Sequence, residues 1–322
     1  MADSKIRELI RVLFDEFAKT GRDNLSVMQI LKTLYLVKME LPDENPLKQR
    51  LAYYWYLKGP TSNVIYCEIK DMEKDGMICH PYKDSEMYCL AADTPPDITH
   101  DEIMSHTSSL ITKHVNSFTS MENMIRDIYD GYSPFPFYTA YNLDFRNKFE
   151  EYCRYVLGSK GGDHMHMRND VLESFDMALL ALPARREFFE FRLLCNDYSK
   201  SLHVLLMTDL SFDEDMEDDF ESARHLCGKI WTAFAYNARL YAYDQHYDQF
   251  IQAWKHKCNA VMKNLQDRIK DFSDSVDRLP VPEEKLSDEV EKIMYKIEHD
   301  KMSASGTHTI GEYRKIIDKM CR

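Results

Sequence analysis

The chain has 322 residues, of which 44% are hydrophobic and 30% are charged. This balance is typical of a folded globular protein and excludes an intrinsically disordered one, and the length allows about two or three domains. The formal net charge is −13, yet residues 1–90 carry 13 Lys and Arg against 14 Asp and Glu. Residues 1–90 therefore carry a net charge of only −1, and the rest of the net negative charge lies after residue 90. An acidic body opposes nonspecific binding to phosphates, so any DNA contact must come from the N-terminal part.

The apolar runs of the chain are short, as at residues 178–183 and 204–207. A membrane span needs about 20 apolar residues, so none is expected. The first residues, Met1–Lys5, lead directly into a helical pattern and contain no apolar block of a signal peptide. We therefore expect a cytoplasmic protein with no membrane contact.

The cysteines are scattered and form no CxxC pair. A disulfide framework would be dense in a small secreted chain, and a structural zinc site would group its ligands closely. The sequence therefore predicts buried free thiols. The cysteines are Cys67, Cys79, Cys89, Cys153, Cys195, Cys227, Cys258 and Cys321.

The first 90 residues predict four helices followed by a hairpin. Apolar residues recur at helical spacing, and Gly21, Pro42 and Gly76 supply helix stops. Ser26 is a candidate N-cap of the second helix, and residues 61–63 offer capping side chains to the fourth. The predicted helices are Ser4–Thr20, Leu25–Leu41, Pro46–Leu57 and a fourth that is capped by residues 61–63 and runs to about Asp75, and the predicted strands are Met77–Pro81 and Glu86–Leu90.

This order of helices and a terminal hairpin is the layout of a winged helix, which we place at residues 1–92. In such domains one helix enters the major groove and the hairpin touches the DNA backbone. The candidate DNA contacts follow from the predicted fourth helix, its preceding turn and the hairpin tip. They are Lys58, Thr61, Ser62, Asn63, Tyr66, Lys70 and Lys83. Acidic residues outnumber Lys70 and Lys74 on that helix, so protein contact is the alternative use of this surface.

Three segments in the same region resemble a known family. They are residues 30–37 (ILKTLYLV), 58–62 (KGPTS) and 69–78 (IKDMEKDGMI). They are similar to the "LQKLLYL" helix, the "yGP-S" turn and the "L-x-x-L-x-x-x-GlI" end of the Panacea (SocA-like) family, over about residues 25–90. This resemblance implies antitoxin or proteolytic-adaptor roles, and hence protein binding at least as much as DNA binding.

Beyond an expected linker at Ala91–Pro96, the chain predicts an all-helical domain at residues 98–210. The pattern over Ile98–Gly131 is that of one long amphipathic helix. The segment Tyr132–Tyr141, which contains two prolines, predicts an aromatic loop, and further helices are expected up to Leu206.

Residues 213–322 form the third predicted region, which begins with the clearest periodicity of the chain. From Asp215 to Val276, apolar residues recur at intervals of three and four, as in long or coiled-coil-like helices. The stretch is either one helix of about 90 Å or a pair folded back near Asp244–Asp248. Charged helices are expected at Glu283–Met302 and Thr309–Met320.

An apolar stripe on this long pattern must be covered by neighbouring helices or by a second copy of the chain. Winged-helix regulators often dimerise through helices outside the DNA-binding unit. We therefore expect a homodimer, with an interface drawn from Ile230, Phe234, Tyr241, Trp254, Val261 and Leu265.

Two other constellations suggest chemistry. His164 and His166 lie close together on a Gly-flanked loop, but no further ligand at a familiar spacing supports a metal site. Arg239 and His246 fit the loose R-x4-6-H pattern of HEPN-type ribonucleases. A surface arginine and histidine explain that match equally well. Phosphate-loop, Rossmann, zincin and nucleophile-elbow motifs do not occur in the sequence.

The sequence therefore predicts a mainly α protein that is not an enzyme and that needs no cofactor or metal. The favoured function is a winged-helix transcription regulator with an acidic helical module for dimerisation or partner binding. The alternatives are a protein-binding adaptor or antitoxin-like protein that does not bind DNA, and a HEPN-like ribonuclease.

Overall fold

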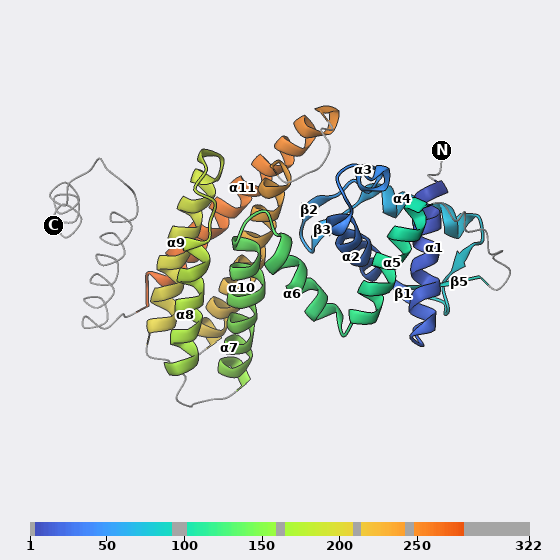
Figure 1. Ribbon diagram of the computed structural model, residues 1–322. Coiled ribbons are helices and arrows are strands. Elements are labelled where there is room, and N and C mark those ends of the chain that lie inside the picture. Colours follow the sequence, from blue (N-terminus) through green and yellow to red (C-terminus); the bar gives the residue numbers. More distant parts are fainter. Residues whose placement is uncertain (1–3, 92–101, 159–164, 209–213, 242–247, 280–322) are drawn as a thin grey trace.

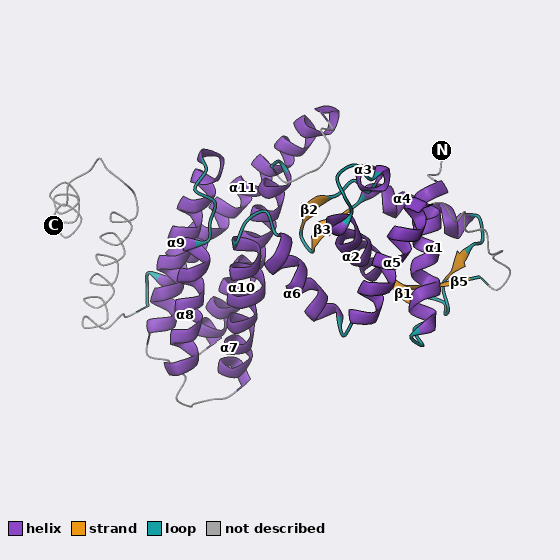
Figure 2. Cartoon of the chain, viewed as in Figure 1, coloured by secondary structure: helices purple, strands orange, loops and turns teal. Residues whose placement is uncertain are grey.

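The computed structural model describes residues 4–91, 102–158, 165–208, 214–241 and 248–279. Over these ranges the chain is mainly helical, with short strands near its N-terminus (Figures 1 and 2), which confirms the prediction of a mainly α protein. In the ranges given, no helix has the length and apolarity needed to cross a membrane. The linker expected at residues 92–96 and the helices expected beyond residue 279 lie outside the described ranges.

The N-terminal part alternates helices with strands of two to four residues. Its helices are α1 (Ser4–Lys19), α2 (Val27–Glu40), α3 (Pro46–Arg50) and α4 (Asn63–Lys74). Its strands are β1 (Leu25–Ser26), β2 (Tyr54–Tyr56), β3 (Gly59–Thr61), β4 (Ile78–Cys79) and β5 (Met87–Leu90).

The strands form two small antiparallel sheets. One has the order β1-β5-β4, with Leu25 opposite Tyr88 and Cys79 opposite Cys89. The other is the β2–β3 hairpin, in which Trp55 lies opposite Pro60. The predicted strands at 77–81 and 86–90 are thus confirmed as an antiparallel pair, and a third strand from residues 25–26 extends their sheet.

Local signals in the sequence set the helix boundaries. Ser26 caps α2 in a capping box, because its hydroxyl accepts from the backbone of Gln29 and the Gln29 side chain accepts from the Ser26 backbone. Ser62 caps α4 by accepting from the Ile65 amide at 3.4 Å. Gly76 ends α4 with a φ of 72°, a left-handed conformation that favours glycine.

The predicted helix Pro46–Leu57 is wrong beyond residue 50, because the aromatic run forms strand β2 instead. Side chains in a strand point alternately to opposite sides. Tyr53 and Trp55 pack against Tyr35 of α2, with ring centroids 5.1 and 6.1 Å away. Tyr54 and Tyr56 point to the other side, toward Arg239. The extended backbone therefore buries Tyr53 and Trp55 on one side and half-buries Tyr54 and Tyr56 on the other.

The rest of the chain is a succession of helices. They are α5 (Glu102–Ser117), α6 (Met121–Tyr132), the π-helix η1 (Tyr138–Phe145), α7 (Arg146–Gly158), α8 (Met165–Leu180), the short 3-10 helix η2 (Arg186–Phe188), α9 (Phe189–Met207), α10 (Glu214–Arg239) and α11 (Asp248–Val276).

The single helix predicted over Ile98–Gly131 is interrupted at residues 118–120. Ser120 accepts from the Asn123 amide at 3.1 Å and so begins a new helix. Helix α5 packs against α1 and α2, and α6 packs against α2. Residues that the sequence assigned to a separate helical domain thus cover the core of the N-terminal part.

The aromatic loop predicted at Tyr132–Tyr141 is largely helical. After the two prolines, the chain enters the π-helix η1, in which Tyr138, Tyr141 and Phe145 are fully buried. Phe137 lies just before η1, and its ring packs 4.3 Å from that of Phe234 on α10. The stabilisation gained by burying these rings in the helical core outweighs the tendency of the two prolines to keep the segment in a loop.

The periodic stretch at Asp215–Val276 forms two helices, α10 and α11, that pack against each other. At one end of the pair, the Trp254 indole donates to the Tyr236 carbonyl at 2.9 Å. At the other end, Arg278 and Ser275 both donate to Asp219 at 3.0 Å. The folded-back alternative is therefore the observed one, and the residues that join the two helices, 242–247, lie outside the described ranges.

This arrangement corrects the predicted dimer stripe. Ile230, Phe234 and Leu265 are buried in the core of the same chain, and Val261 packs partly buried against that core. Trp254 packs on Tyr236 with ring centroids 4.6 Å apart. Of the six residues, Tyr241 remains well exposed, at 40%. Because helices of the same chain cover the stripe, it gives no reason to require a second copy.

We predict that the Phe234→Ala variant loses about 3–5 kcal/mol of unfolding free energy, since it opens a cavity among aromatic rings. Phe189→Ala is the matched control, because Phe189 is 60% exposed whereas Phe234 is fully buried. The control should change stability by no more than about 0.5 kcal/mol. Urea unfolding followed by far-UV circular dichroism measures both. Equal losses would contradict the placement of Phe234 in the core.

Candidate functional site

The candidate DNA contacts gather around the start of α4, the β2–β3 turn and the β4–β5 hairpin. Most of them are exposed: Lys58, Asn63, Tyr66, Lys70 and Lys83. Thr61 is half-buried. Lys83 lies in the turn of the hairpin, where the Ser85 amide donates to the Tyr82 carbonyl at 3.1 Å. The residues are thus brought to one region, although they come from separate elements.

Ser62 is the exception and corrects the prediction. Its side chain is fully buried, and its hydroxyl accepts the hydrogen bond that caps α4. An N-cap position fixes the start of the helix and leaves this hydroxyl facing the backbone. Ser62 therefore positions α4 and is not available for contact with a ligand.

The acidic residues of α4 and its C-cap, which argued against DNA contact, are largely engaged by other groups. Arg7 of α1 donates through Nε to Glu68 at 2.6 Å and through Nη1 to Asp75 at 2.8 Å. Its hydrogen bond to Glu68 is the main cause that raises the pKa of Arg7. Glu68 is buried against α1. One arginine thus forms ion pairs with two carboxylates of this segment, and the three groups together carry one net negative charge.

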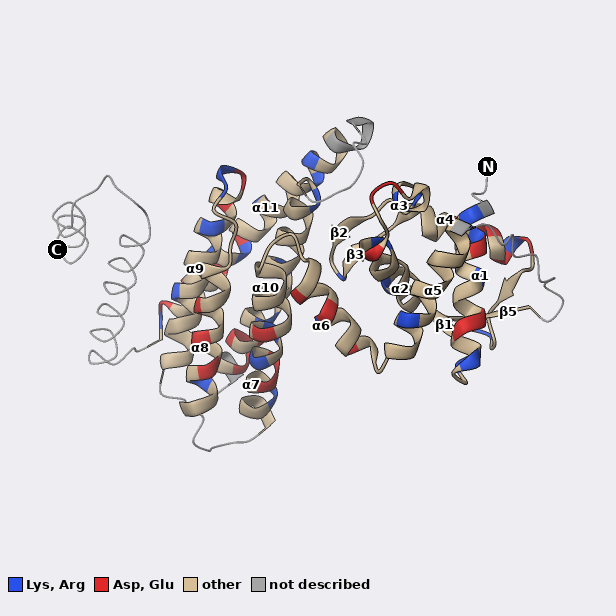
Figure 3. Cartoon of the chain, viewed as in Figure 1, with Lys and Arg blue, Asp and Glu red and all other residues tan. Residues whose placement is uncertain are grey.

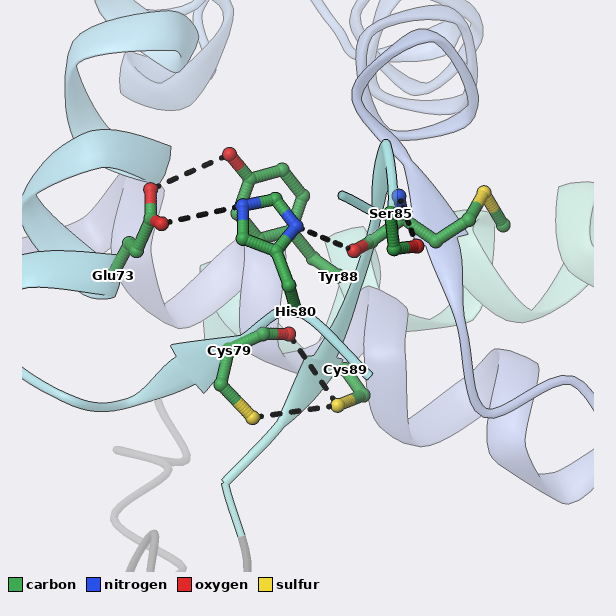
Figure 4. Close-up of polar contacts among 7 residues, drawn as sticks. Glu73, Cys79, His80, Ser85, Tyr88 and Cys89 are labelled. Carbon is green, nitrogen blue, oxygen red and sulfur yellow. Dashed lines mark hydrogen bonds and ion pairs between the residues drawn. The ribbon is translucent and has the colours of Figure 1, made fainter. Parts of the chain in front are cut away.

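A third carboxylate, Glu73, faces the hairpin. Figure 4 shows it beside His80 and Tyr88: the His80 Nε2 lies 3.3 Å from one oxygen, and the Tyr88 hydroxyl donates to the other at 3.4 Å. The His80 Nδ1 lies 2.9 Å from the Met87 carbonyl, and its ring packs 4.3 Å from that of Tyr88. Burial, followed by the charge of Glu73, raises the pKa of Tyr88. These contacts fix the hairpin against α4.

The exposed face of α4 that remains is polar and basic. Asn63, Tyr66, Lys70 and Lys74 are three or four residues apart and therefore share one side of the helix, and all four are exposed. Asp71 is the carboxylate of α4 for which the structure gives no such partner, and it is exposed beside them. The Asn63 side chain accepts from the Tyr54 hydroxyl at 2.9 Å.

A groove lies between the start of α2, the β2–β3 turn, α4 and the hairpin. It has a volume of about 670 Å³. Its lining includes Leu31, Lys58, Tyr66, His80 and Tyr88. Three of the predicted contact residues, Lys58, Thr61 and Tyr66, thus border a depression that combines apolar, aromatic and cationic side chains.

Lys32 lies beneath this groove and holds the β2–β3 turn. Its ammonium donates to the carbonyls of Lys58 and Pro60, the latter at 2.8 Å. Burial, assisted by the charge of Lys58, lowers the pKa of Lys32 to about 7. The turn also requires Gly59, which has a φ of 80° and whose Cβ, if added, would lie 2.7 Å from the Tyr129 ring.

Sequence reasoning missed Arg7, Lys32 and the His80–Tyr88 pair. Arg7 lies on the amphipathic helix α1, where charged residues are ordinary, whereas Lys32 lies in the buried stretch of α2. The partners of both residues are distant in sequence. The His80–Tyr88 contact follows from the hairpin register, since Cys79 lies opposite Cys89. This register is the feature of the sequence from which the His80–Tyr88 contact can be predicted.

The ribonuclease residues are not brought together within the described ranges. Arg239 ends α10, and its guanidinium lies 3.9 Å from the ring centroid of Trp254 and 4.1 Å from that of Tyr54. Such stacking is a cation–π contact between the two parts of the chain. His246 lies outside the described residues.

The histidines considered for a metal site are likewise not assembled. His166 is exposed and lies 3.4 Å from Asp170 on the next turn of α8, and His164 is outside the described ranges. Among the residues that the structure describes, no group of three or more His, Cys, Asp or Glu is arranged to hold a metal ion.

The cysteine prediction holds in part. Cys153, Cys195, Cys227 and Cys258 are buried free thiols, and burial raises the pKa of each. Three others are not buried: Cys67 and Cys79 are exposed and Cys89 is half-buried. All three lie on α4 or the β4–β5 hairpin.

Comparison with models of protein families, with curated proteins and with solved structures yields no match for this chain.

We predict that the pH dependence of stability changes in the Lys32→Met variant. The folded-state pKa of Lys32, about 7, lies below the ordinary value of 10.5. Between these values the unfolded chain binds a proton that the folded chain lacks, so this group makes stability rise with pH. The slope is at most about 1.4 kcal/mol per pH unit.

Urea unfolding at three pH values between 6.5 and 8.5 tests this expectation. The stability difference, wild type minus variant, should grow as pH rises, because other titrating groups cancel in the subtraction. A difference that is constant across this interval would contradict a lowered pKa for Lys32.

Proposed function

We propose that this chain is a DNA-binding regulator whose N-terminal part is a winged helix. The order α1, β1, α2, α4, β4, β5 and the sheet β1-β5-β4 support this proposal. In it, α4 is the recognition helix and the β4–β5 hairpin is the wing. The β2–β3 hairpin is then an insertion between the second and third helices of the unit.

The observation that carries the proposal is the exposed face of α4. Asn63 and Tyr66 offer groups for base edges, while Lys70 and Lys74 are suited to phosphates. Lys58 and Lys83 stand on the two turns that flank the helix. Because Arg7 pairs with Glu68 and Asp75, these three groups together present a net charge of −1, rather than −2, to an approaching phosphate backbone.

The net negative charge of the whole chain is compatible with DNA binding because many of its acidic residues lie on the helical part, away from α4 and the β4–β5 hairpin. Six Asp and Glu residues fall within residues 214–221, at the start of α10, and Figure 3 shows further acidic residues on α7 and α8. The contacts of α10 with β2 lie at its other end, near Tyr236. From Glu217 to Tyr236 the helix extends by roughly 28 Å, and at physiological salt charges are screened over about 8 Å.

We predict that the full-length protein binds duplex DNA with an affinity that falls as salt rises. The double variant Lys70→Gln, Lys74→Gln should weaken binding and make the slope of log affinity against log salt shallower by about 1.8, since each phosphate contact contributes about 0.9. Fluorescence anisotropy of a labelled duplex over a salt series measures both quantities.

The matched control is the double variant Lys263→Gln, Lys270→Gln. These lysines are exposed on α11, and the change in net charge is the same. The control should leave the salt slope unchanged. Equal losses in both variants would mean that only overall charge matters. Lack of binding even at low salt would overturn the proposal and favour the alternative, an adaptor that uses the groove beside Tyr66 to hold a protein segment.

A further inference from the structure

Two accessible cysteines lie directly opposite each other in the β4–β5 hairpin. Cys79 ends β4 and Cys89 is its partner in the antiparallel register. Figure 4 shows their sulfur atoms facing each other, 3.5 Å apart. The Cys89 thiol also lies 3.4 Å from the Cys79 carbonyl, to which it donates.

The backbone geometry at this pair suits a covalent bond between the sulfurs. Opposite residues of an antiparallel ladder have Cα atoms about 4.5–5.5 Å apart, and a disulfide needs about 4.4–6.8 Å. The sulfurs must approach from 3.5 Å to about 2.05 Å. Rotations of the two side chains supply this movement, so the strands need not shift.

The pair is also set apart from the other cysteines by its access to solvent. The four cysteines of the helical part are buried, so solution reagents do not reach them. Cys67 is exposed as well, but it stands on α4, outside the β4–β5 register. Cys79 and Cys89 thus combine an exposed thiol with a second thiol in bonding position.

We propose that Cys79 and Cys89 form a thiol–disulfide exchange site whose co-reactants are disulfides of low molecular weight. The Cys79 thiolate attacks one sulfur of the external disulfide, which forms a mixed disulfide and releases one external thiol. The Cys89 thiolate then attacks the Cys79 sulfur and releases the second external thiol. One external disulfide becomes two thiols, and the two protein thiols are oxidised to one disulfide.

The order of the two steps follows from the surroundings of each thiol. Burial and the hydrogen bond with Cys79 raise the pKa of Cys89, which reduces its thiolate fraction. Cys79 is the more exposed of the two. Cys79 is therefore the attacking thiol, and Cys89 resolves the mixed disulfide.

The bond would close the hairpin across its turn. The residues next to the cysteines are His80 and Tyr88, which hold the hairpin against Glu73 of α4. Oxidation therefore restrains the segment that carries Lys83 and this contact with α4. The proposal concerns the chemistry of the hairpin itself and holds whether or not the hairpin touches DNA.

The test treats the full-length protein with oxidised glutathione, followed by intact mass measurement and peptide mapping without reduction. The wild type should lose the mass of two hydrogen atoms and yield a cross-linked peptide pair that contains Cys79 and Cys89. A reducing agent should restore the original mass. Cys67→Ser is the matched control with an exposed cysteine removed, and it should behave as the wild type does at this pair.

The single variants separate the two roles. Cys89→Ser should accumulate a glutathione adduct on Cys79, because no thiol resolves it. Cys79→Ser should show neither the cross-link nor rapid adduct formation at Cys89. Stable adducts on Cys79 of the wild type, or no reaction there, would overturn the proposal, as would a bond between Cys67 and either cysteine of the pair.

Discussion

The β2–β3 hairpin packs against α2 and α6 on one side and against α10 on the other, and these contacts join the two parts of the chain. On the N-terminal side, the ring centroid of Trp55 lies 6.1 Å from that of Tyr35 on α2 and 5.5 Å from that of Tyr129 on α6. On the other side, the Trp231 indole of α10 donates to the Leu57 carbonyl at 3.0 Å. Strand β2, whose side chains point in both directions, thus connects the N-terminal part with the helical part. Gly59 and Lys32 hold its turn closed.

Because the helical part contacts the N-terminal part at β2, it leaves uncovered the surface that carries the β4–β5 hairpin. The helical part occupies the side of β2, as Figure 1 shows, whereas the hairpin β4–β5 lies away from it. The hairpin and its Lys83 therefore lie on a surface that the helical part does not cover. Lys58 and Asn63 instead adjoin the contact with α10, because Leu57 accepts from Trp231 and Tyr54, which donates to Asn63, stacks on Arg239. The acidic residues at the start of α10 are held at the far end of the same bundle. Separation of the two charge regions follows from the direction in which α10 runs from its acidic start to its contact with β2.

The sequence predicted those features that depend on local signals. Ser26, Ser62 and Gly76 mark helix ends by hydrogen bonding and backbone conformation, and the hairpin at 77–90 was found from its turn. The aromatic run at residues 53–56 was assigned to a helix because every residue in it is apolar or aromatic, so neither a period of two nor one of 3.6 is visible. Only the positions of Tyr35 and Arg239 on either side decide in favour of a strand.

The sequence predicts the place of the candidate site on α4 and the hairpin, but it does not predict which of its charged residues are paired. The sequence does not show that Glu68 and Asp75 are paired, because their partner Arg7 is 61 and 68 residues away and leaves no local signal. The same reason explains the predicted dimer stripe: periodicity identified its residues as apolar but cannot say which helix covers them. Ile230 and Phe234 are covered by the chain itself.

The central claim is that α4 and the β4–β5 hairpin form the surface that meets DNA. Hydrogen–deuterium exchange of the full-length protein, with and without a saturating duplex, tests it most directly, since bound DNA slows exchange where it covers the backbone. The account predicts slower exchange in peptides spanning residues 63–74 and 78–90, with peptides from the start of α10 unchanged. Slower exchange centred on α10 or α11, with α4 and the hairpin unaffected, would contradict it.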